Sequence, residues 1–122
     1  MNSSSALTTA VDYHRAWTSG DFAAATALLA DDLAVEVPVN AYAGKADFAA
    51  ALASFGGAAT EVRLLAELSG RDDACLVYDM DVPGLGTLRV AEHFRVVDGR
   101  IRLIRQIHDT AAVRKAGFAP PL

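Results

Sequence analysis

Three charged side chains on the apolar face of a predicted hairpin are the strongest candidates for chemistry in this sequence. Residues 87–109 show the alternation of two strands joined at Asp98-Gly99, a residue pair that tolerates the positive φ angles of a tight turn. If only these two residues form the turn, Glu92 faces Arg105 directly across the hairpin. Because side chains alternate between the two faces of a strand, Glu92, Arg105 and Asp109 share one face with a set of apolar residues. That set is Leu88, Val90, Phe94, Val96, Ile101, Leu103 and Ile107.

Glu92 could act in proton transfer, because burial on an apolar face raises the pKa of a carboxyl group toward neutrality. Alternatively, Glu92 forms a structural ion pair with Arg105, which would keep the carboxylate charged and lower its pKa. Arg105 has a further interpretation, since its planar guanidinium suits the carboxylate or enolate oxygen of a ligand. The sequence leaves these alternatives open.

Two further candidates each have a functional and a structural interpretation. Asp109 could exchange a proton with a carbon acid, or it could cap a short helix whose first turn begins at Thr110. Tyr13 could donate a hydrogen bond to an oxyanion, or it could pack in the core with its hydroxyl satisfied by a neighbour. The residue types alone do not separate these roles.

No metal or cofactor is expected. The three histidines, His14, His93 and His108, share no ligand spacing, whereas a metal site needs convergent ligands. The second face of the hairpin is predicted to point away from the apolar side and to carry Arg89, Ala91, His93, Arg95, Arg102, Ile104, Gln106 and His108.

Composition limits the class of protein. A chain of 122 residues supports one core, so we expect a single domain over residues 1–122. A net charge of −4 argues against nucleic acid as a partner, because phosphates require a basic surface. No apolar run approaches the roughly 20 residues of a membrane-spanning helix. The first five residues lack the basic and apolar regions of a signal peptide and Cys75 has no partner for a disulfide, so we expect a cytoplasmic protein without membrane contact.

Helical periodicity precedes strand alternation along the chain. A short helical turn with an extended end is predicted after Asp109, and Gly56-Gly57 is predicted to close the third helix. Helices followed by antiparallel strands with short turns are typical of the α+β class. The predicted helices cover residues 4–18, 22–30 and 45–55, and the predicted strands before the hairpin cover residues 33–39, 60–69 and 74–82.

This order of elements resembles the nuclear transport factor 2-like superfamily. That resemblance implies three N-terminal helices packed on a curved, mainly antiparallel sheet around a cone-shaped pocket, the cystatin-like roll. Residues 13–21, Tyr-His-Arg-Ala-Trp-Thr-Ser-Gly-Asp, with the continuation to Pro38, are similar to the opening of ketosteroid isomerases and of polyketide-cyclase-like (SnoaL-like) proteins. Residues 107–117 are similar to the end of the polyketide-cyclase-like group. The scaffold hosts isomerases, cyclases, epoxide hydrolases, dehydratases and non-catalytic modules, so it does not define a reaction.

The resemblance to the isomerases assigns roles to individual residues. Tyr13 matches their oxyanion-hole tyrosine, and Glu92 lines up near their proton-donating aspartic acid. Their general-base aspartate falls on Val37, and because valine carries no proton, steroid isomerisation is not expected here. The pocket wall is expected to include Trp17, Val37, Phe48, Leu52, Phe55, Tyr78, Met80, Val90 and Ile107.

The expected function is binding of a small, mostly apolar or amphipathic molecule in the cone. Acid–base chemistry of the cyclase, isomerase or hydrolase type is one interpretation, with Tyr13, Glu92, Arg105 and Asp109 as the polar groups. The alternative is a non-catalytic ligand-binding or dimerisation module in which Glu92 and Arg105 form a structural pair.

A homodimer is also expected. Sheets of this superfamily commonly pair, and the outer strand faces of this chain mix Val77, Ala91 and Ile104 with polar residues.

Overall fold

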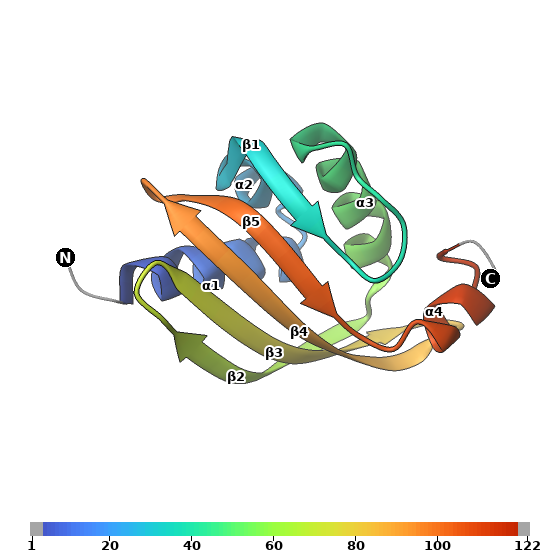
Figure 1. Ribbon diagram of the computed structural model, residues 1–122. Helices are drawn as coiled ribbons and strands as arrows, with labels where there is room; N and C mark the ends of the chain where they lie inside the picture. Colours follow the sequence, from blue (N-terminus) through green and yellow to red (C-terminus); the bar gives the residue numbers. More distant parts are fainter. Residues whose placement is uncertain (1–3, 120–122) are drawn as a thin grey trace.

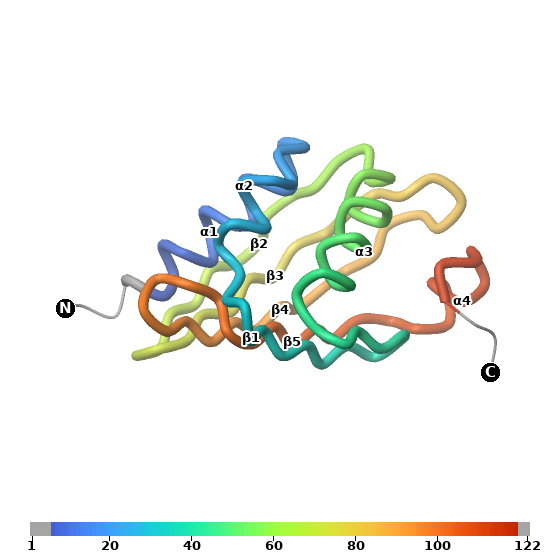
Figure 2. The backbone as a smooth tube through the Cα atoms, turned by 90° about the horizontal axis from the view of Figure 1, so that it is seen from above, coloured from blue at the N-terminus to red at the C-terminus, as the bar shows by residue number. Residues whose placement is uncertain are grey.

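The computed structural model describes residues 4–119 and places three helices on one side of a curved sheet (Figures 1 and 2). The extended end predicted for the tail lies partly in residues 120–122, outside the described range. Among the described residues, no helix is long and apolar enough to cross a membrane. The elements in chain order are α1 (Ser4–Thr18), α2 (Phe22–Ala27), β1 (Leu29–Glu36), α3 (Lys45–Ala58), β2 (Glu61–Ser69), β3 (Asp73–Val82), β4 (Gly86–Val97), β5 (Arg100–Ile107) and α4 (Ala111–Lys115).

The five strands form one sheet in the order β1-β5-β4-β3-β2. Strand β1 runs parallel to β5, and the other three pairings are antiparallel. Helix α1 packs against the inner face of the sheet, while α3 contacts α1 and β1. The predicted α+β fold with a curved, mainly antiparallel sheet is therefore confirmed.

Two helix ends differ from the sequence prediction. Helix α2 ends at Ala27 rather than Ala30, because Leu29 is fully buried and already pairs with Ile101 of β5. Helix α3 continues through Gly56-Gly57 to Ala58. A Cβ atom on Gly56 would lie 3.1 Å from the Trp17 ring, so this glycine lets α3 approach α1 closely rather than ending the helix.

The hairpin contains a β-bulge that the sequence prediction missed. Its turn is as predicted, with φ of 52° at Asp98 and 74° at Gly99, and the first opposed pairs follow the expected register. Arg95 then pairs with Leu103 instead of Arg102, which leaves Arg102 as an extra residue in β5. Beyond Arg102, every opposed pair is shifted by one residue.

This bulge reverses the two faces of the rest of β5. Ile104, predicted to face outward, is fully buried, and Gln106 now lies opposite Glu92. Arg105 and Ile107, predicted to face the pocket, point to the outer side, where Ile107 is 67% exposed. The predicted pairing of Glu92 with Arg105 is therefore wrong.

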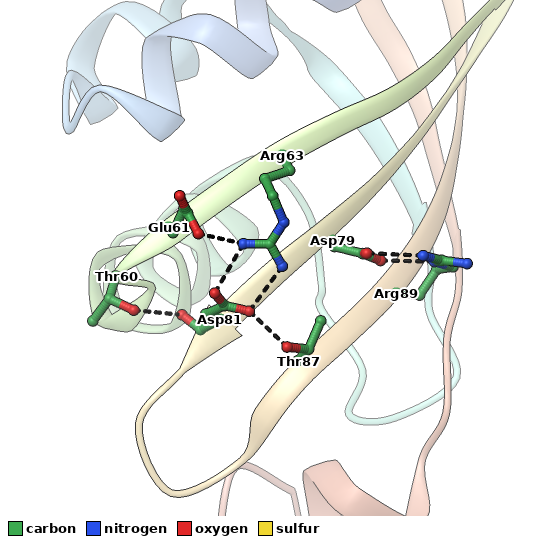
Figure 3. A network of polar contacts seen from close by, with 7 residues as sticks. All are labelled: Thr60, Glu61, Arg63, Asp79, Asp81, Thr87 and Arg89. Atoms are coloured by element: carbon green, nitrogen blue, oxygen red, sulfur yellow. Dashed lines mark hydrogen bonds and ion pairs between the residues drawn. The ribbon is translucent and has the colours of Figure 1, made fainter.

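Ion pairs between neighbouring strands lie at one end of the outer face of the sheet (Figure 3). Arg63 of β2 donates to both carboxylate oxygens of Asp81 at 2.9 and 3.1 Å, and Asp81 also accepts from the Thr87 hydroxyl at 2.7 Å. Arg89 of β4 donates to Asp79 of β3 at 2.7 and 2.9 Å. Each arginine at this end of the outer face is thus paired with acidic groups of the same chain.

Candidate functional site

A cavity of about 420 Å³ lies between the helices and the inner face of the sheet. Helices α1 and α3 supply one side, and strands β3, β4 and β5 supply the other. The structure places in its wall the predicted lining residues Trp17, Val37, Phe48, Leu52, Phe55, Tyr78, Met80 and Val90. Its polar lining residues are Asn40, Tyr42, Ser54, Tyr78, Glu92, Gln106 and His108.

Glu92 is the charged centre of this cavity wall. Its side chain projects from β4 onto the inner face, and the residue is only 1% exposed. The Tyr78 hydroxyl of β3 donates to Oε1 at 3.1 Å, and the Gln106 amide of β5 donates to Oε2 at 2.7 Å. Three adjacent strands therefore fix the carboxyl group, since each contributes one member of the hydrogen-bonded set.

Burial raises the pKa of Glu92 to about 7, from an ordinary value of 4.5. The hydrogen bonds from Gln106 and Tyr78 act in the opposite direction, because they favour the charged form, but they do not offset the loss of hydration. A carboxyl group with this pKa is present in both protonation states near neutral pH, so it can donate or accept a proton.

Arg105 lies on the outer face and has other partners. Its guanidinium donates to the two carboxylate oxygens of Glu36 at 3.1 and 3.0 Å, and it lies 3.3 Å from Nδ1 of His93. No Lys or Arg belongs to the described lining of the cavity. The ion-pair interpretation predicted a lowered pKa for Glu92. Without an arginine partner, burial raises this pKa instead.

Tyr13 is fully buried behind the cavity wall rather than in it. Its ring packs edge-on against Phe94 at 5.7 Å between centroids, and its hydroxyl has no hydrogen-bond partner among the described residues. Burial, together with the nearby charge of Glu92, raises the pKa of Tyr13 above its ordinary value. The hydroxyl therefore stays protonated and can only be a hydrogen-bond donor or acceptor.

Asp109 lies outside the cavity lining. Its Oδ1 accepts a hydrogen bond from the backbone N–H of Ala111 at 3.0 Å, at the start of α4. This contact matches the capping interpretation of Asp109, because it satisfies an N–H group of the first helical turn.

His14 is buried next to the cavity. Its ring lies 5.4 Å from the Trp17 ring and 4.8 Å from the Tyr78 ring, and both of those rings form part of the wall. Burial lowers the pKa of His14 to about 4, so the imidazole is neutral at physiological pH. Its Nδ1 has no hydrogen-bond partner among the described residues.

The segment after β5 closes one end of the cavity. Val113 of α4 and Phe118 belong to its lining, and the Phe118 ring packs edge-on against Phe55 of α3 at 4.8 Å. The Asn40 side chain donates to the Phe118 carbonyl oxygen at 3.3 Å. This segment stands at the end of the sheet, beside α3 (Figure 1).

Gln106 and His108 are the polar lining residues that the sequence prediction placed on the wrong face. The signal that could have revealed them is the adjacent apolar pair Leu103-Ile104, which interrupts the alternation of β5 at the bulge.

Across the described residues, no group of three or more His, Cys, Asp and Glu side chains is arranged to hold a metal ion.

Comparisons with known proteins agree with this architecture. A family model for the SnoaL-like domain matches residues 10–104. A crystal structure of a protein from Kribbella flavida DSM 17836 is 32% identical, with a TM-score of 0.88, over 93% of this chain and 94% of that chain.

Two enzymes share the fold at lower identity. An LEH-like epoxide hydrolase from M. tuberculosis is 24% identical, with a TM-score of 0.74, over 93% of this chain and 90% of that chain. A steroid delta-isomerase from Pseudomonas aeruginosa is 19% identical, with a TM-score of 0.76, again over 93% and 90%. Similarity at this level shows the fold alone. A search for curated relatives gave no match.

Proposed function

Because this chain belongs to the SnoaL-like domain family, within the nuclear transport factor 2-like superfamily, we propose that its cavity binds a small, neutral, mostly apolar molecule and that Glu92 exchanges a proton with it. One observation carries this proposal. A carboxyl group that is 1% exposed, with a pKa of about 7 and no cationic neighbour in the described lining, forms part of the wall of a cavity large enough for a ligand.

The cavity lining favours a neutral ligand over an anionic one. Aromatic and aliphatic side chains make up most of the wall, and an anion would find neither Lys nor Arg there. An anion would also face Glu92 in its charged form, and two uncompensated negative charges in a poorly hydrated site repel strongly. Ligand oxygens would instead meet the proton of neutral Glu92.

The position of Glu92 suits proton transfer to a carbonyl, enol or epoxide oxygen, or exchange with a carbon acid. Such steps belong to isomerase, cyclase and hydrolase chemistry, in which a carboxyl group with a pKa near the working pH is effective. Steroid isomerisation is not part of the proposal, because the general base of the isomerases is expected to fall on Val37, which carries no proton and lines the cavity.

A non-catalytic ligand-binding module is the second candidate. It is supported by the engagement of both Glu92 carboxylate oxygens, by Tyr78 and by Gln106, which makes the group part of a closed hydrogen-bonded set. In this case the ligand would contact the wall without exchanging a proton.

The single tryptophan of the chain, Trp17, lies in the wall and reports ligand binding by fluorescence quenching. The neutral probe is 2-acetylnaphthalene, and the matched anion is 2-naphthoate. We expect the ketone to bind at least tenfold more tightly than the anion, and its affinity to fall as the pH rises through 7, because ionised Glu92 loses the proton it donates. The E92Q variant should bind the ketone without this pH dependence, whereas E67Q, which changes an exposed glutamate, should behave like the wild type. Equal affinity for ketone and anion would refute the proposed ligand class.

Deuterium exchange separates the two candidate functions. The methyl protons of 2-acetylnaphthalene are weakly acidic, and their replacement in D₂O can be followed by proton NMR. Acid–base function predicts exchange faster than in buffer for the wild type and loss of this acceleration in E92Q. Binding without accelerated exchange of this ketone would favour the non-catalytic module.

A further inference from the structure

His108 is a polar residue of the cavity lining that lies outside the hydrogen-bonded set formed by Glu92, Tyr78 and Gln106. It follows the last residue of β5 and belongs to the cavity lining. Two residues separate by about 7 Å along an extended chain, so His108 lies one such step beyond Gln106, which itself contacts Glu92. A ligand in the cavity can therefore have Glu92 near one part of its surface and His108 near another.

The tautomer of neutral His108 is determined by a backbone contact. Nδ1 lies 2.9 Å from the carbonyl oxygen of Asp109. A carbonyl oxygen can only accept, so Nδ1 carries the proton and Nε2 of the neutral ring has a free lone pair. The Gln106 amide differs in this respect, because its Nε2 already donates to Oε2 of Glu92.

Nε2 of His108 has no hydrogen-bond partner within residues 4–119. Two amides of the lining are already committed as donors, Gln106 to Glu92 and Asn40 to the Phe118 carbonyl oxygen. His108 is half-buried, so a ligand that covers Nε2 removes this acceptor from water and gains affinity if it supplies a donor in exchange.

We propose that Nε2 of His108 accepts a hydrogen bond from a hydroxyl or N–H group of the ligand. This inference rests on the proposed function, in which the cavity binds a neutral, mostly apolar molecule. It narrows the ligand class to neutral molecules that carry a hydrogen-bond donor at the end facing His108, such as phenols, alcohols or N–H heterocycles. His108 is then a specificity-determining residue, because it rejects ligands that present only an acceptor or an ether at that position.

The test compares 2-naphthol with 2-methoxynaphthalene, which replaces the donor by a methyl ether. Quenching of Trp17 gives both affinities in the wild type and in the H108F, H108Q and E67Q variants. We expect the wild type to prefer the naphthol about tenfold, which is the value of one hydrogen bond. H108F should lose this preference, H108Q should recover part of it through its amide oxygen, and E67Q, which changes an exposed glutamate, should retain it. In the ¹⁵N NMR spectrum of the wild type, the naphthol should shift the Nε2 resonance of His108 and the ether should not.

The possible failures are distinguishable. If both probes bind and H108F keeps the wild-type preference, the role of His108 is refuted while the proposed binding function stands. An unshifted Nε2 resonance in the wild type refutes that role without depending on the folding of any variant. If neither probe quenches Trp17 in the wild type, the proposed function itself fails, and the role of His108 fails with it.

Discussion

Replacing Glu92 by glutamine should change how stability depends on pH. The folded-state pKa of Glu92 is about 7 and the ordinary value is 4.5, so between these values the folded state holds a proton that the unfolded state releases. The contribution of the neutral carboxyl group is fully present below pH 4.5 and is lost as the pH rises through 7. That difference in pKa corresponds to about 3 kcal/mol of unfolding free energy. In E92Q the side chain cannot ionise, so this loss disappears.

A measurement on the wild type by itself would not reveal the pH dependence from Glu92, because His14 contributes an opposing one. Its folded-state pKa is about 4, below the ordinary 6.5, so the unfolded state binds a proton over this range while the folded state does not. Stability from neutral His14 is present above pH 6.5 and is lost as the pH falls toward 4. Between pH 4.5 and 6.5 the contributions of Glu92 and His14 therefore have opposite slopes, and only a difference between variants isolates Glu92.

The measurement is urea unfolding of the wild type and E92Q at intervals from pH 4.5 to 8.5. The unfolding free energy of E92Q minus that of the wild type should increase by about 3 kcal/mol over this range. The same difference for E67Q, an exposed glutamate of β2, should vary little. If the E92Q difference is flat, Glu92 ionises as it would in water, and the physical basis for its acid–base role is removed.

Three further outcomes are expected. R105M should leave the urea midpoint almost unchanged, because Arg105 and Glu36 are both exposed and such pairs stabilise little; a loss as large as that for a buried pair would contradict the outer placement. The chain should sediment as a homodimer at micromolar concentration, and I107E should make it a monomer, because Ile107 is the most exposed large apolar residue of the outer sheet face; a monomeric wild type would refute the dimer. The wild type should not turn over a Δ5-3-ketosteroid, because Val37 cannot act as the base, and measurable turnover would mean that another group has taken that role.

Much of the architecture was accessible from the sequence because it depends on local patterns. Apolar spacing located the first three helices, and the Asp98-Gly99 pair predicted the turn of the hairpin with the correct first register. The burial of Glu92 also followed from alternation along β4, since β4 pairs with β3 in an unbroken register. Each of these features depends on residues that are close together in the sequence.

The hydrogen-bond partners of Glu92 could not be predicted from such local patterns. A turn rule extends a register along a whole hairpin, whereas one extra residue in β5 shifts every later pair. The partners of Glu92 were consequently predicted as Arg105, when they are Gln106 and Tyr78. The closing segment with Phe118 also depends on long-range contacts, to Phe55 and to Asn40, for which periodicity carries no signal.

The extra residue in β5 also has a consequence for how such a cavity can diverge. Loss of the single codon for Arg102 would remove the bulge and leave every later pair in place, so Gln106 and His108 would stay in the cavity. Regular pairing with Arg102 retained would instead shift each later pair by one residue and turn Arg105 and Ile107 inward. The unpaired state of Arg102, whose side chain contacts the exposed Asp32, thus decides whether β5 presents an amide and an imidazole or a permanent cation to the cavity. In this fold, the binding chemistry of the cavity can change through the pairing of one surface residue, without any substitution among the lining residues.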